Sequence, residues 1–208
     1  MKLAPTREAE IRQRLRPAMG DPPATQLSRS RARVRDWFAH TAPLIQWDHM
    51  DCPLGRLFVG VSRQGLCAVD FGRDESAFLA RFDRQARLER NPRVVSRAIA
   101  ELREYFSGAR KAFTLPVDLS RLTAFQRSVL ETACRIPLGQ VWTYQRIAQE
   151  MHRPKSSRPV GQALASNPIP IVIPCHRVIA SDGSLGGYSG GSGLDAKRWL
   201  LRLEGALS

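Results

Sequence analysis

NPIPIVIPCHRV, residues 167–178, is the stretch around which the rest of this sequence is organised. Its prolines lack backbone N–H donors, so the apolar run is a poor fit to a regular central strand. The sequence therefore predicts an extended, rigid wall over these residues. The thiol of Cys175 would be held in a fixed place at the end of that wall.

The Cys175-His176 pair is a candidate for nucleophilic chemistry. The thiolate is the reactive form of cysteine, and a nearby imidazole can take the thiol proton. For an arbitrary pair, a buried cysteine beside a surface histidine is the commoner arrangement. Adjacent residues of an extended chain also point to opposite faces, so joint action would need a bend or a bridging water.

Short helices are predicted immediately upstream of this segment. Thr123 is a suitable N-cap for the first, Thr143 begins the second, and the third is expected over residues 156–165. Pro137-Leu138-Gly139 separates the first two. This spacing is typical of a helix-turn-helix, in which the third helix would enter a groove of a nucleic acid. A purely structural helical hairpin has the same pattern, so the pattern alone leaves both open.

A glycine-rich loop, GGYSGG at residues 186–191, follows the wall. It matches neither of the common phosphate-binding loop motifs, and we expect it to form the rim of a pocket for a planar ligand. The last helix is predicted over residues 194–203, with Lys197 and Arg198 opposite its apolar side.

Glu204 stands at the end of this last helix. A carboxylate is unfavourable there because of the helix dipole, so a specific partner such as His176 would explain it. The default for a single glutamate is a solvated charge.

The first half of the chain predicts a small mixed sheet with helices packed on it. Alternating apolar residues over 57–61 and 66–71, with turn residues between them, indicate a hairpin. Helices are expected over 74–90 and 94–107, and one face of the second is formed by Val94, Ala98, Leu102 and Tyr105 or Phe106. The basic first 40 residues are predicted to form a mobile tail.

Composition is that of a globular protein, with 43% hydrophobic and 25% charged residues in 208. The net charge of +13 is unevenly distributed: residues 1–35, 36–120 and 121–208 carry +6, +1 and +6. The basic C-terminal part suggests a polyanion such as nucleic acid, although an arginine-rich proteome would give the same background. The four cysteines show no zinc-finger spacing or disulfide framework, and no apolar run is long enough to span a membrane.

Together these motifs resemble the O6-alkylguanine-DNA alkyltransferases, a family of DNA-repair proteins. Ile173-Pro174-Cys175-His176-Arg177-Val178 matches the acceptor motif of that family. The supporting matches stand in the expected order: Pro137-Leu138-Gly139, Thr143-Tyr144, Arg158, Val160-Gly161, Asn167-Pro168, Tyr188-Ser189-Gly190-Gly191, Leu200-Leu201 and Glu204-Gly205.

The fold that this resemblance implies is α/β (α+β). A ribonuclease-H-like domain over 41–116 would be followed by a mainly helical, winged helix-turn-helix-like domain over 117–208. Residues 1–40 would form the basic extension. The sequence lacks a cysteine-rich metal-binding N-terminal module of the kind found in the adaptive-response regulators of the family, so a second role as a transcription activator is not expected.

The resemblance also implies a chemical role for each matching residue. Cys175 would accept the alkyl group, His176 would deprotonate it through a water, and Glu204 would hold and polarise His176. Tyr144 would donate toward the leaving guanine. The thioether would be permanent, so each molecule would act once, without a metal or cofactor.

The remaining matches would bind substrate. Arg158 would fill the gap left by a flipped nucleotide in the minor groove of double-stranded DNA, with Gly161 on the same helix. Tyr188 and Ser189 would line the base pocket. Asn167 would brace the turn before the wall. The Pro170 stretch would form the apolar side of the alkyl channel. Pro159 departs from the family pattern directly after Arg158.

Two other functions are compatible with parts of the sequence. A non-catalytic sensor that binds alkylated DNA would have a different residue at the acceptor position, where this chain has Cys175. A thiol hydrolase built on Cys175-His176 would leave the basic helical segment without a purpose. We expect a monomer located in the cytoplasm, or in the nucleus if the source is eukaryotic.

Overall fold

The computed structural model describes residues 42–72 and 74–207. The basic extension predicted over residues 1–40 lies outside the described residues. From Pro43 onward the described chain belongs to one compact unit. Within the described ranges, no helix is long and apolar enough to cross a membrane.

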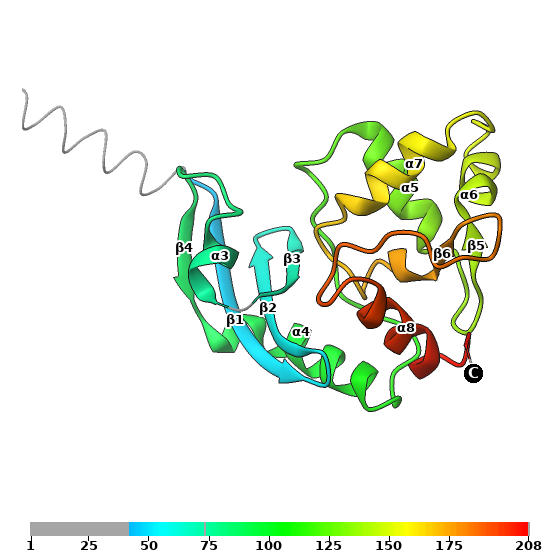
Figure 1. Ribbon diagram of the computed structural model, residues 1–208. Coiled ribbons are helices and arrows are strands. Elements are labelled where there is room, and N and C mark those ends of the chain that lie inside the picture. Colours follow the sequence, from blue (N-terminus) through cyan, green and yellow to red (C-terminus); the bar gives the residue numbers. More distant parts are fainter. Residues whose placement is uncertain (1–41, 73, 208) are drawn as a thin grey trace, which may run out of the picture. The chain divides into compact units, whose positions relative to one another are not determined.

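A four-stranded sheet forms the first half of this unit, in the order β3-β2-β1-β4 (Figure 1). Its strands are β1 (Leu44–Cys52), β2 (Gly55–Ser62), β3 (Gly65–Phe71) and β4 (Arg87–Arg90). The first three strands pair antiparallel, which confirms the predicted hairpin, and β4 runs parallel to β1.

The helix predicted over residues 74–90 is wrong. Only α3 (Glu75–Leu79) is helical, and the chain then turns at Asp83 before it enters β4. The Asp83 side chain accepts a hydrogen bond from the backbone of Gln85, a local arrangement that competes with a helix. Pairing of β4 with β1 satisfies the backbone that follows, so tertiary structure overrides local propensity here.

The second predicted helix is confirmed as α4 (Pro92–Phe106). Pro92 occupies the first helical position and the Asn91 side chain caps the helix. The predicted buried face is confirmed at Ala98, Leu102 and Tyr105. It is wrong only at Val94, which is 44% exposed while its neighbour Val95 is fully buried. The helix packs against β1 and β2.

The strand pleat sends alternate side chains to two separate cores. Leu57 and Val59 on β2 join the main core, whereas Phe58 between them joins a small aromatic cluster beneath α3. We call Trp47, Phe58, Ala68 and Phe78 the aromatic cluster. The rings of Phe58 and Phe78 are stacked with centroids 5.2 Å apart.

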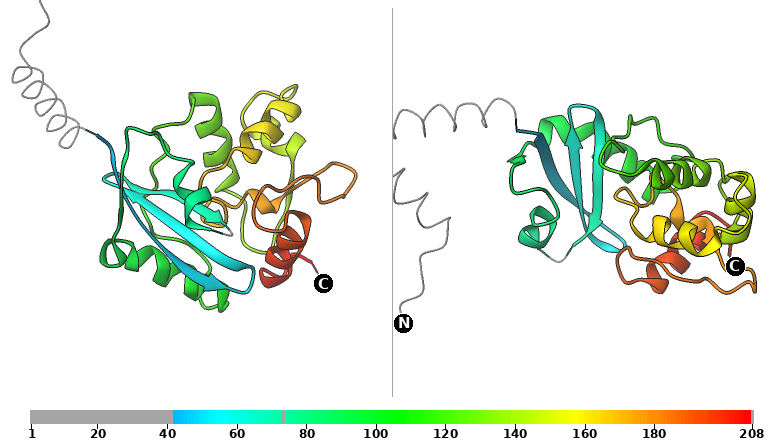
Figure 2. Two further views of the ribbon diagram at one scale, coloured as in Figure 1. Left: turned by 60° about the vertical axis from the view of Figure 1, so that its left-hand side comes forward. Right: turned by 90° about the horizontal axis from the view of Figure 1, so that it is seen from above.

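The second half of the unit is built from the predicted helices, and all of them are confirmed. They are α5 (Ala124–Ala133), α6 (Tyr144–Glu150), α7 (Ser157–Ala165) and α8 (Leu194–Leu203). Figure 2 shows them from two further directions. Thr123 and Gln126 form a reciprocal capping box at α5, and Thr143 caps α6. The helix α7 packs on both α5 and α6, as the third helix of a helix-turn-helix does.

The segment 167–178 is folded into turns and is not extended, which corrects the predicted wall. Ile171 has a φ of 75°, and Ile173 donates a backbone hydrogen bond to Ile169 across the resulting turn. The residues Cys175–Arg177 then form a short 3-10 helix, η1, followed by the two-residue strand β6 (Val178–Ile179), which pairs with β5 (Trp142–Thr143). The bend that joint action of Cys175 and His176 requires is therefore present.

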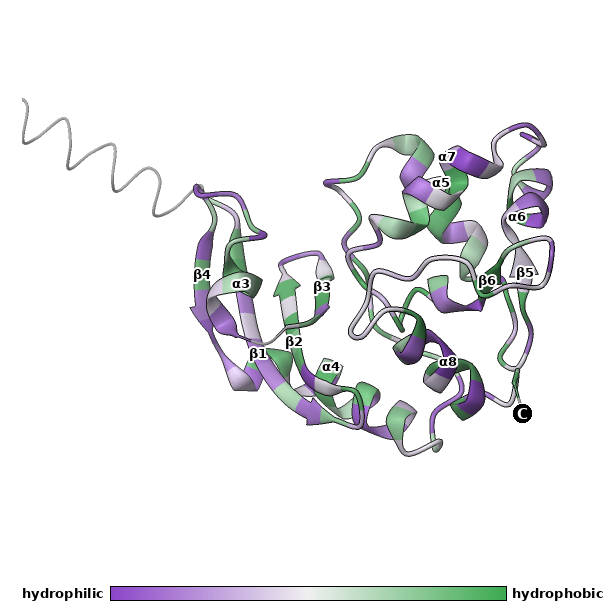
Figure 3. Cartoon of the chain, viewed as in Figure 1, coloured by the Kyte–Doolittle hydropathy of each residue, from purple (hydrophilic) through white to green (hydrophobic). Residues whose placement is uncertain are grey.

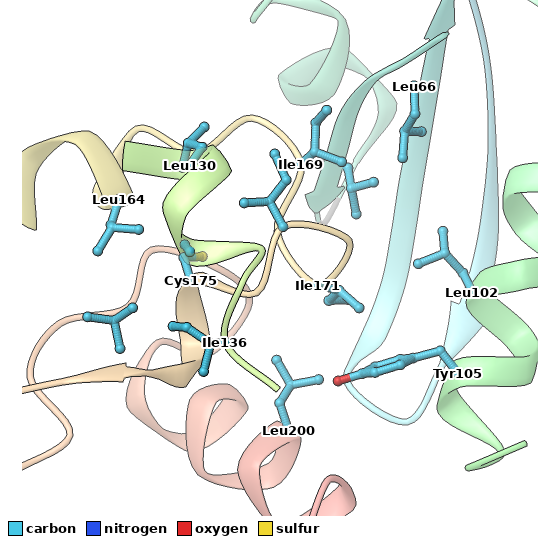
Figure 4. Packing of buried hydrophobic residues seen from close by; sticks show 14 of the residues in the cluster. Leu66, Leu102, Tyr105, Leu130, Ile136, Leu164, Ile169, Ile171, Cys175 and Leu200 are labelled. Carbon is cyan, nitrogen blue, oxygen red and sulfur yellow. The ribbon is translucent and has the colours of Figure 1, made fainter. Parts of the chain in front are cut away.

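The two halves of the unit share one hydrophobic core. Figure 4 shows buried side chains from β3 and α4 facing those of α5, α8 and the 167–178 segment. Backbone hydrogen bonds add to this packing, because Val69 of β3 donates to Pro168 and Leu66 donates to Pro116. Along α8, hydrophobic and hydrophilic residues alternate (Figure 3), as expected for a helix that covers this core.

Candidate active site

A cavity of about 230 Å³ opens between α7 and the glycine-rich loop, and Cys175 lies at its inner end. Its lining combines apolar surface with two phenols and one hydroxyl. The lining residues are Tyr144, Gly161, Leu164, Ala165, Cys175, Gly187, Tyr188 and Ser189.

Close packing of backbone shapes the rim of this cavity. Gly186 has a φ of 64°, and a Cβ there would lie 2.9 Å from the Tyr144 hydroxyl. Only glycine fits this position without displacing the phenol. Tyr144 in turn forms a hydrogen bond with the Gly187 backbone. The loop and Tyr144 thus fix one another at the mouth of the cavity.

Cys175 is held by the backbone and by Asn167. The Asn167 side chain donates to the Cys175 sulfur at 3.1 Å and to the Ile173 carbonyl at 3.0 Å. Burial raises the pKa of the Cys175 thiol to about 11, although the Asn167 hydrogen bond and the nearby Lys197 charge oppose this. The resting residue is therefore a protonated thiol whose anion already has a donor in place.

His176 is fully buried, and its Nε2 lies 3.0 Å from Oε1 of Glu204. A carboxylate can only accept, so this contact places the imidazole proton on Nε2. Burial lowers the pKa of His176 and keeps it neutral, while the Glu204 hydrogen bond opposes that shift. The lone pair is then on Nδ1, which has no hydrogen-bond partner within the described part of the chain. This ring is poised to accept a proton.

Glu204 is stabilised as an anion inside the protein. Burial would raise the pKa of its carboxyl, but hydrogen bonds from His176 and Arg177 and their charges outweigh that effect and hold it at about 2. Arg177 supplies two donors, with its Nε 2.7 Å from Oε2 and its Nη2 2.9 Å from Oε1. Because Arg177 neutralises Glu204, His176 can stay uncharged beside it. The predicted partnership of His176 and Glu204 is present in the structure.

Tyr105 makes a further contact with Glu204. It reaches this site from α4, and its hydroxyl donates to Oε1 at 2.7 Å. We call Glu204, His176, Arg177 and Tyr105 the carboxylate cluster.

Lys197 differs most from its sequence prediction. It was expected on the solvent face of α8 but is fully buried. Its ammonium donates to the backbone carbonyls of Val178, Leu185 and Gly187, which is why the charge is tolerated. Burial lowers its pKa to about 8, opposed by the Cys175 charge. Lys197 thus joins the glycine-rich loop to β6, close to the thiol.

The structure brings together most of the residues that the sequence singled out. Cys175, Tyr144, Gly161, Tyr188 and Ser189 share the cavity.

Besides His176 and Glu204, three predicted site residues lie outside the lining of that cavity. Asn167 is buried next to Cys175. Arg158 is exposed in the first turn of α7, where the proline that follows it is tolerated. Pro170 is buried, not at the cavity wall, and bridges to Ile173.

Sequence reasoning missed Arg177, Tyr105 and Lys197 as parts of this site. Arg177 stands inside the acceptor motif, so its position was a usable signal. Tyr105 and Lys197 occupy helical positions whose patterns indicate only core and surface, respectively.

Fold and site together define a class: an α/β protein with a helix-turn-helix whose third helix borders a cavity ending in a buried, hydrogen-bonded thiol. Two family models match the chain, the ribonuclease-like domain of 6-O-methylguanine DNA methyltransferase over residues 45–119 and the DNA binding domain of the same family over residues 124–206. The chain belongs to the 6-O-methylguanine DNA methyltransferase family, which confirms the resemblance and the expected fold class.

Curated relatives agree with this assignment. A methylated-DNA–protein-cysteine methyltransferase of Methanosarcina barkeri is 39% identical over 158 residues, covering 76% of this chain and 96% of the relative. The bifunctional transcriptional activator/DNA repair enzyme Ada of Escherichia coli is 36% identical over 157 residues, covering 74% of this chain but only 44% of Ada.

Solved structures are similar as well. The crystal structure of Mycobacterium tuberculosis OGT in complex with DNA has a TM-score of 0.68 and 34% identity, covering 77% of this chain and 93% of that one. An O6-methylguanine-DNA methyltransferase of Pyrococcus kodakaraensis, 24% identical with a TM-score of 0.55, shares the fold.

Proposed function

We propose that this protein repairs DNA by transferring a methyl or other alkyl group from O6 of guanine, or by the same displacement from O4 of thymine, to Cys175. The observation that carries this proposal is the cavity itself, in a chain of this family: a thiol with an anion-stabilising donor lies at its inner end, beside the third helix of a helix-turn-helix. The alkylated oxygen lies inside a stacked duplex, so the base must be flipped out to reach such a thiol.

The transfer proceeds by displacement. The thiol proton passes through a water to Nδ1 of His176, and Glu204 holds the Nε2 proton of the same ring. The sulfur then forms a bond to the alkyl carbon as the carbon–oxygen bond breaks. Tyr144 donates a proton to the departing guanine and recovers one from solvent, while Tyr188 and Ser189 hold the base.

The product is a thioether, and the carboxylate cluster contains no second nucleophile that would remove it. Each molecule therefore repairs one lesion. We place this activity in the cytoplasm, or in a nucleus, where the protein acts as a monomer on double-stranded DNA without a cofactor.

The acceptor role is tested with a duplex that contains O6-methylguanine. Intact-mass and peptide analysis should find a single added methyl group on Cys175 and at most one per protein molecule. Cys175→Ala should abolish transfer and keep DNA binding, with Cys134→Ala as the matched control on an exposed cysteine of the neighbouring helix end.

Other outcomes of the same experiment identify the alternatives. Lesion binding without methylation of the native protein would make it a sensor. Removal of more than one methyl group per protein molecule, with no lasting adduct on Cys175, would make it a thiol hydrolase. Either outcome would refute the proposed repair function.

The DNA-binding role of α7 has its own test. Arg158 is exposed and forms no ion pair with any residue that the structure describes, so it is free to contact phosphates or the gap in the duplex. Arg158→Ala should weaken duplex binding and flatten the slope of log affinity against log salt by about one phosphate contact. Arg135→Ala is the control, because Arg135 is already paired with Glu150. Equal slopes for Arg158→Ala and the native protein would contradict the role.

A further inference from the structure

Tyr105 is the one member of the carboxylate cluster that comes from the first half of the unit. It stands on α4, is 2% exposed, and packs against the rings of Phe106 and Phe113. Figure 4 shows its ring extending from α4 toward α8, with the oxygen leading. The surroundings of the ring are apolar, so phenylalanine would pack equally well there. Packing therefore does not explain why a tyrosine stands here, and the reason must lie in the hydrogen bond of its hydroxyl.

The Tyr105 hydroxyl contacts the Glu204 carboxylate. Oε1 of Glu204 receives Tyr105 at 2.7 Å, His176 at 3.0 Å and Arg177 at 2.9 Å. The Tyr105 bond is the shortest of the three. A carboxylate oxygen offers about two lone-pair sites, so three donors on Oε1 weaken one another's hydrogen bonds. Tyr105 therefore competes directly with the histidine for the same lone pairs.

We propose that Tyr105 is a positioning residue for alkyl transfer, which fixes the Glu204 carboxylate and sets how strongly it polarises His176. The ribonuclease-like half of the chain then completes the active site of the other half. This inference rests on the proposed function and adds a residue to it.

The groups that face this site determine in which direction the pKa of His176 changes when the Tyr105 hydroxyl is removed. Arg177, Lys197 and Tyr188 surround Glu204 and His176 in addition to Tyr105, and Cys175 lies next to them. Removing the Tyr105 hydroxyl leaves all of these in place but withdraws one donor from Oε1. The carboxylate then attracts the imidazole N–H more strongly, which raises the pKa of His176. The base is consequently protonated at a higher pH than in the native protein.

Tyr105→Phe tests this prediction, with single-turnover methyl transfer measured from a duplex containing O6-methylguanine across pH. We expect a rate about tenfold lower at neutral pH, as for the loss of one hydrogen bond to a charged group. The acid limb of the pH profile should also shift to higher pH. DNA affinity should be unchanged, because Tyr105 is buried away from α7.

Ile99→Val on the same helix is the matched control. It shortens a buried side chain of α4 that takes part in none of the hydrogen bonds of the carboxylate cluster. At a temperature where all proteins are folded, it should leave the rate and the acid limb unchanged.

The outcomes separate the two proposals. A native protein that does not transfer the methyl group refutes the proposed function. A native protein that transfers, together with a Tyr105→Phe variant whose acid limb is unmoved, refutes the positioning role even if the rate falls.

Discussion

The aromatic cluster beneath α3 and the carboxylate cluster around Glu204 are both buried, but different forces hold them. The first consists of stacked and tilted rings, with Phe58 and Phe78 fully or almost fully inaccessible. The second places an arginine, a histidine and a phenol in the interior, each hydrogen-bonded to one buried carboxylate. Burial of apolar side chains stabilises the fold directly. Buried charges stabilise it only if their pairing and hydrogen bonds outweigh the free energy lost when the charges are removed from water.

This difference indicates which region exists for stability and which for chemistry. A ring removed from the aromatic cluster leaves a void and nothing else. A partner removed from the carboxylate cluster leaves an unpaired charge in the interior and an altered base beside the thiol. Substitutions in the two regions should therefore separate stability from alkyl transfer.

Arg177→Met is expected to have the largest effect, because it leaves the Glu204 charge buried without its bidentate partner. The free energy of unfolding should fall by about 3–5 kcal/mol, and methyl transfer should be lost. Urea denaturation and the transfer assay measure the two effects. The double variant Arg177→Met, Glu204→Leu should regain much of the stability but none of the transfer. If the double variant were no more stable than the single one, the unpaired charge would not be the cause.

Phe78→Leu should destabilise the protein by about 2 kcal/mol through loss of ring packing in the aromatic cluster. Its transfer rate should equal that of the native protein at a temperature where both are folded. Thermal unfolding and single-turnover kinetics on the same preparations test this. A slower transfer by the folded variant would show that the two regions are not independent.

Acidification should produce the most gradual effect. The Glu204 pKa lies at about 2 in the folded protein against an ordinary 4.5, so its contribution to stability is present above pH 4.5 and is lost as the pH falls through 4.5 toward 2. The lowered pKa of buried His176 adds a loss that begins below pH 6.5. Urea midpoints measured from pH 7 to pH 3 should therefore decline.

Glu204→Gln provides the comparison for this measurement. The amide does not titrate, so the variant should be less stable at pH 7 and lose less between pH 4.5 and pH 3. Parallel declines in the two proteins would assign the effect to other carboxylates.

Local signals in the sequence were sufficient to predict most of the helices and to identify the acceptor motif. The caps at Thr123 and Thr143 each place a hydroxyl where the first free backbone donors lie, and α5 and α6 begin there. The turn residues between β2 and β3 likewise mark a hairpin that the structure contains.

The failures of prediction depended on distant partners. Residues 87–90 form a strand because β1 is available to pair with them. The residues themselves carry no local pattern that predicts a strand. Lys197 is buried because three carbonyls from the glycine-rich loop and β6 converge on it. Tyr105 and Glu204 are 99 positions apart in the chain. Hydrophobic periodicity of 2 or 3.6 residues does not predict contacts between residues far apart in the sequence. The carboxylate cluster could therefore be predicted only in part.

The hydrogen bonds that β3 makes outside the sheet have a practical consequence. As an edge strand it would offer unpaired backbone groups to a neighbouring molecule, but Pro116 and Pro168 accept from Leu66 and Val69 along that edge. Pro116 lies within the ribonuclease-like domain, whereas Pro168 belongs to the acceptor half. An excised fragment of residues 45–119 would keep the Pro116 contact but would uncover the β3 edge at Val69, and it should aggregate at concentrations where the intact chain stays dispersed.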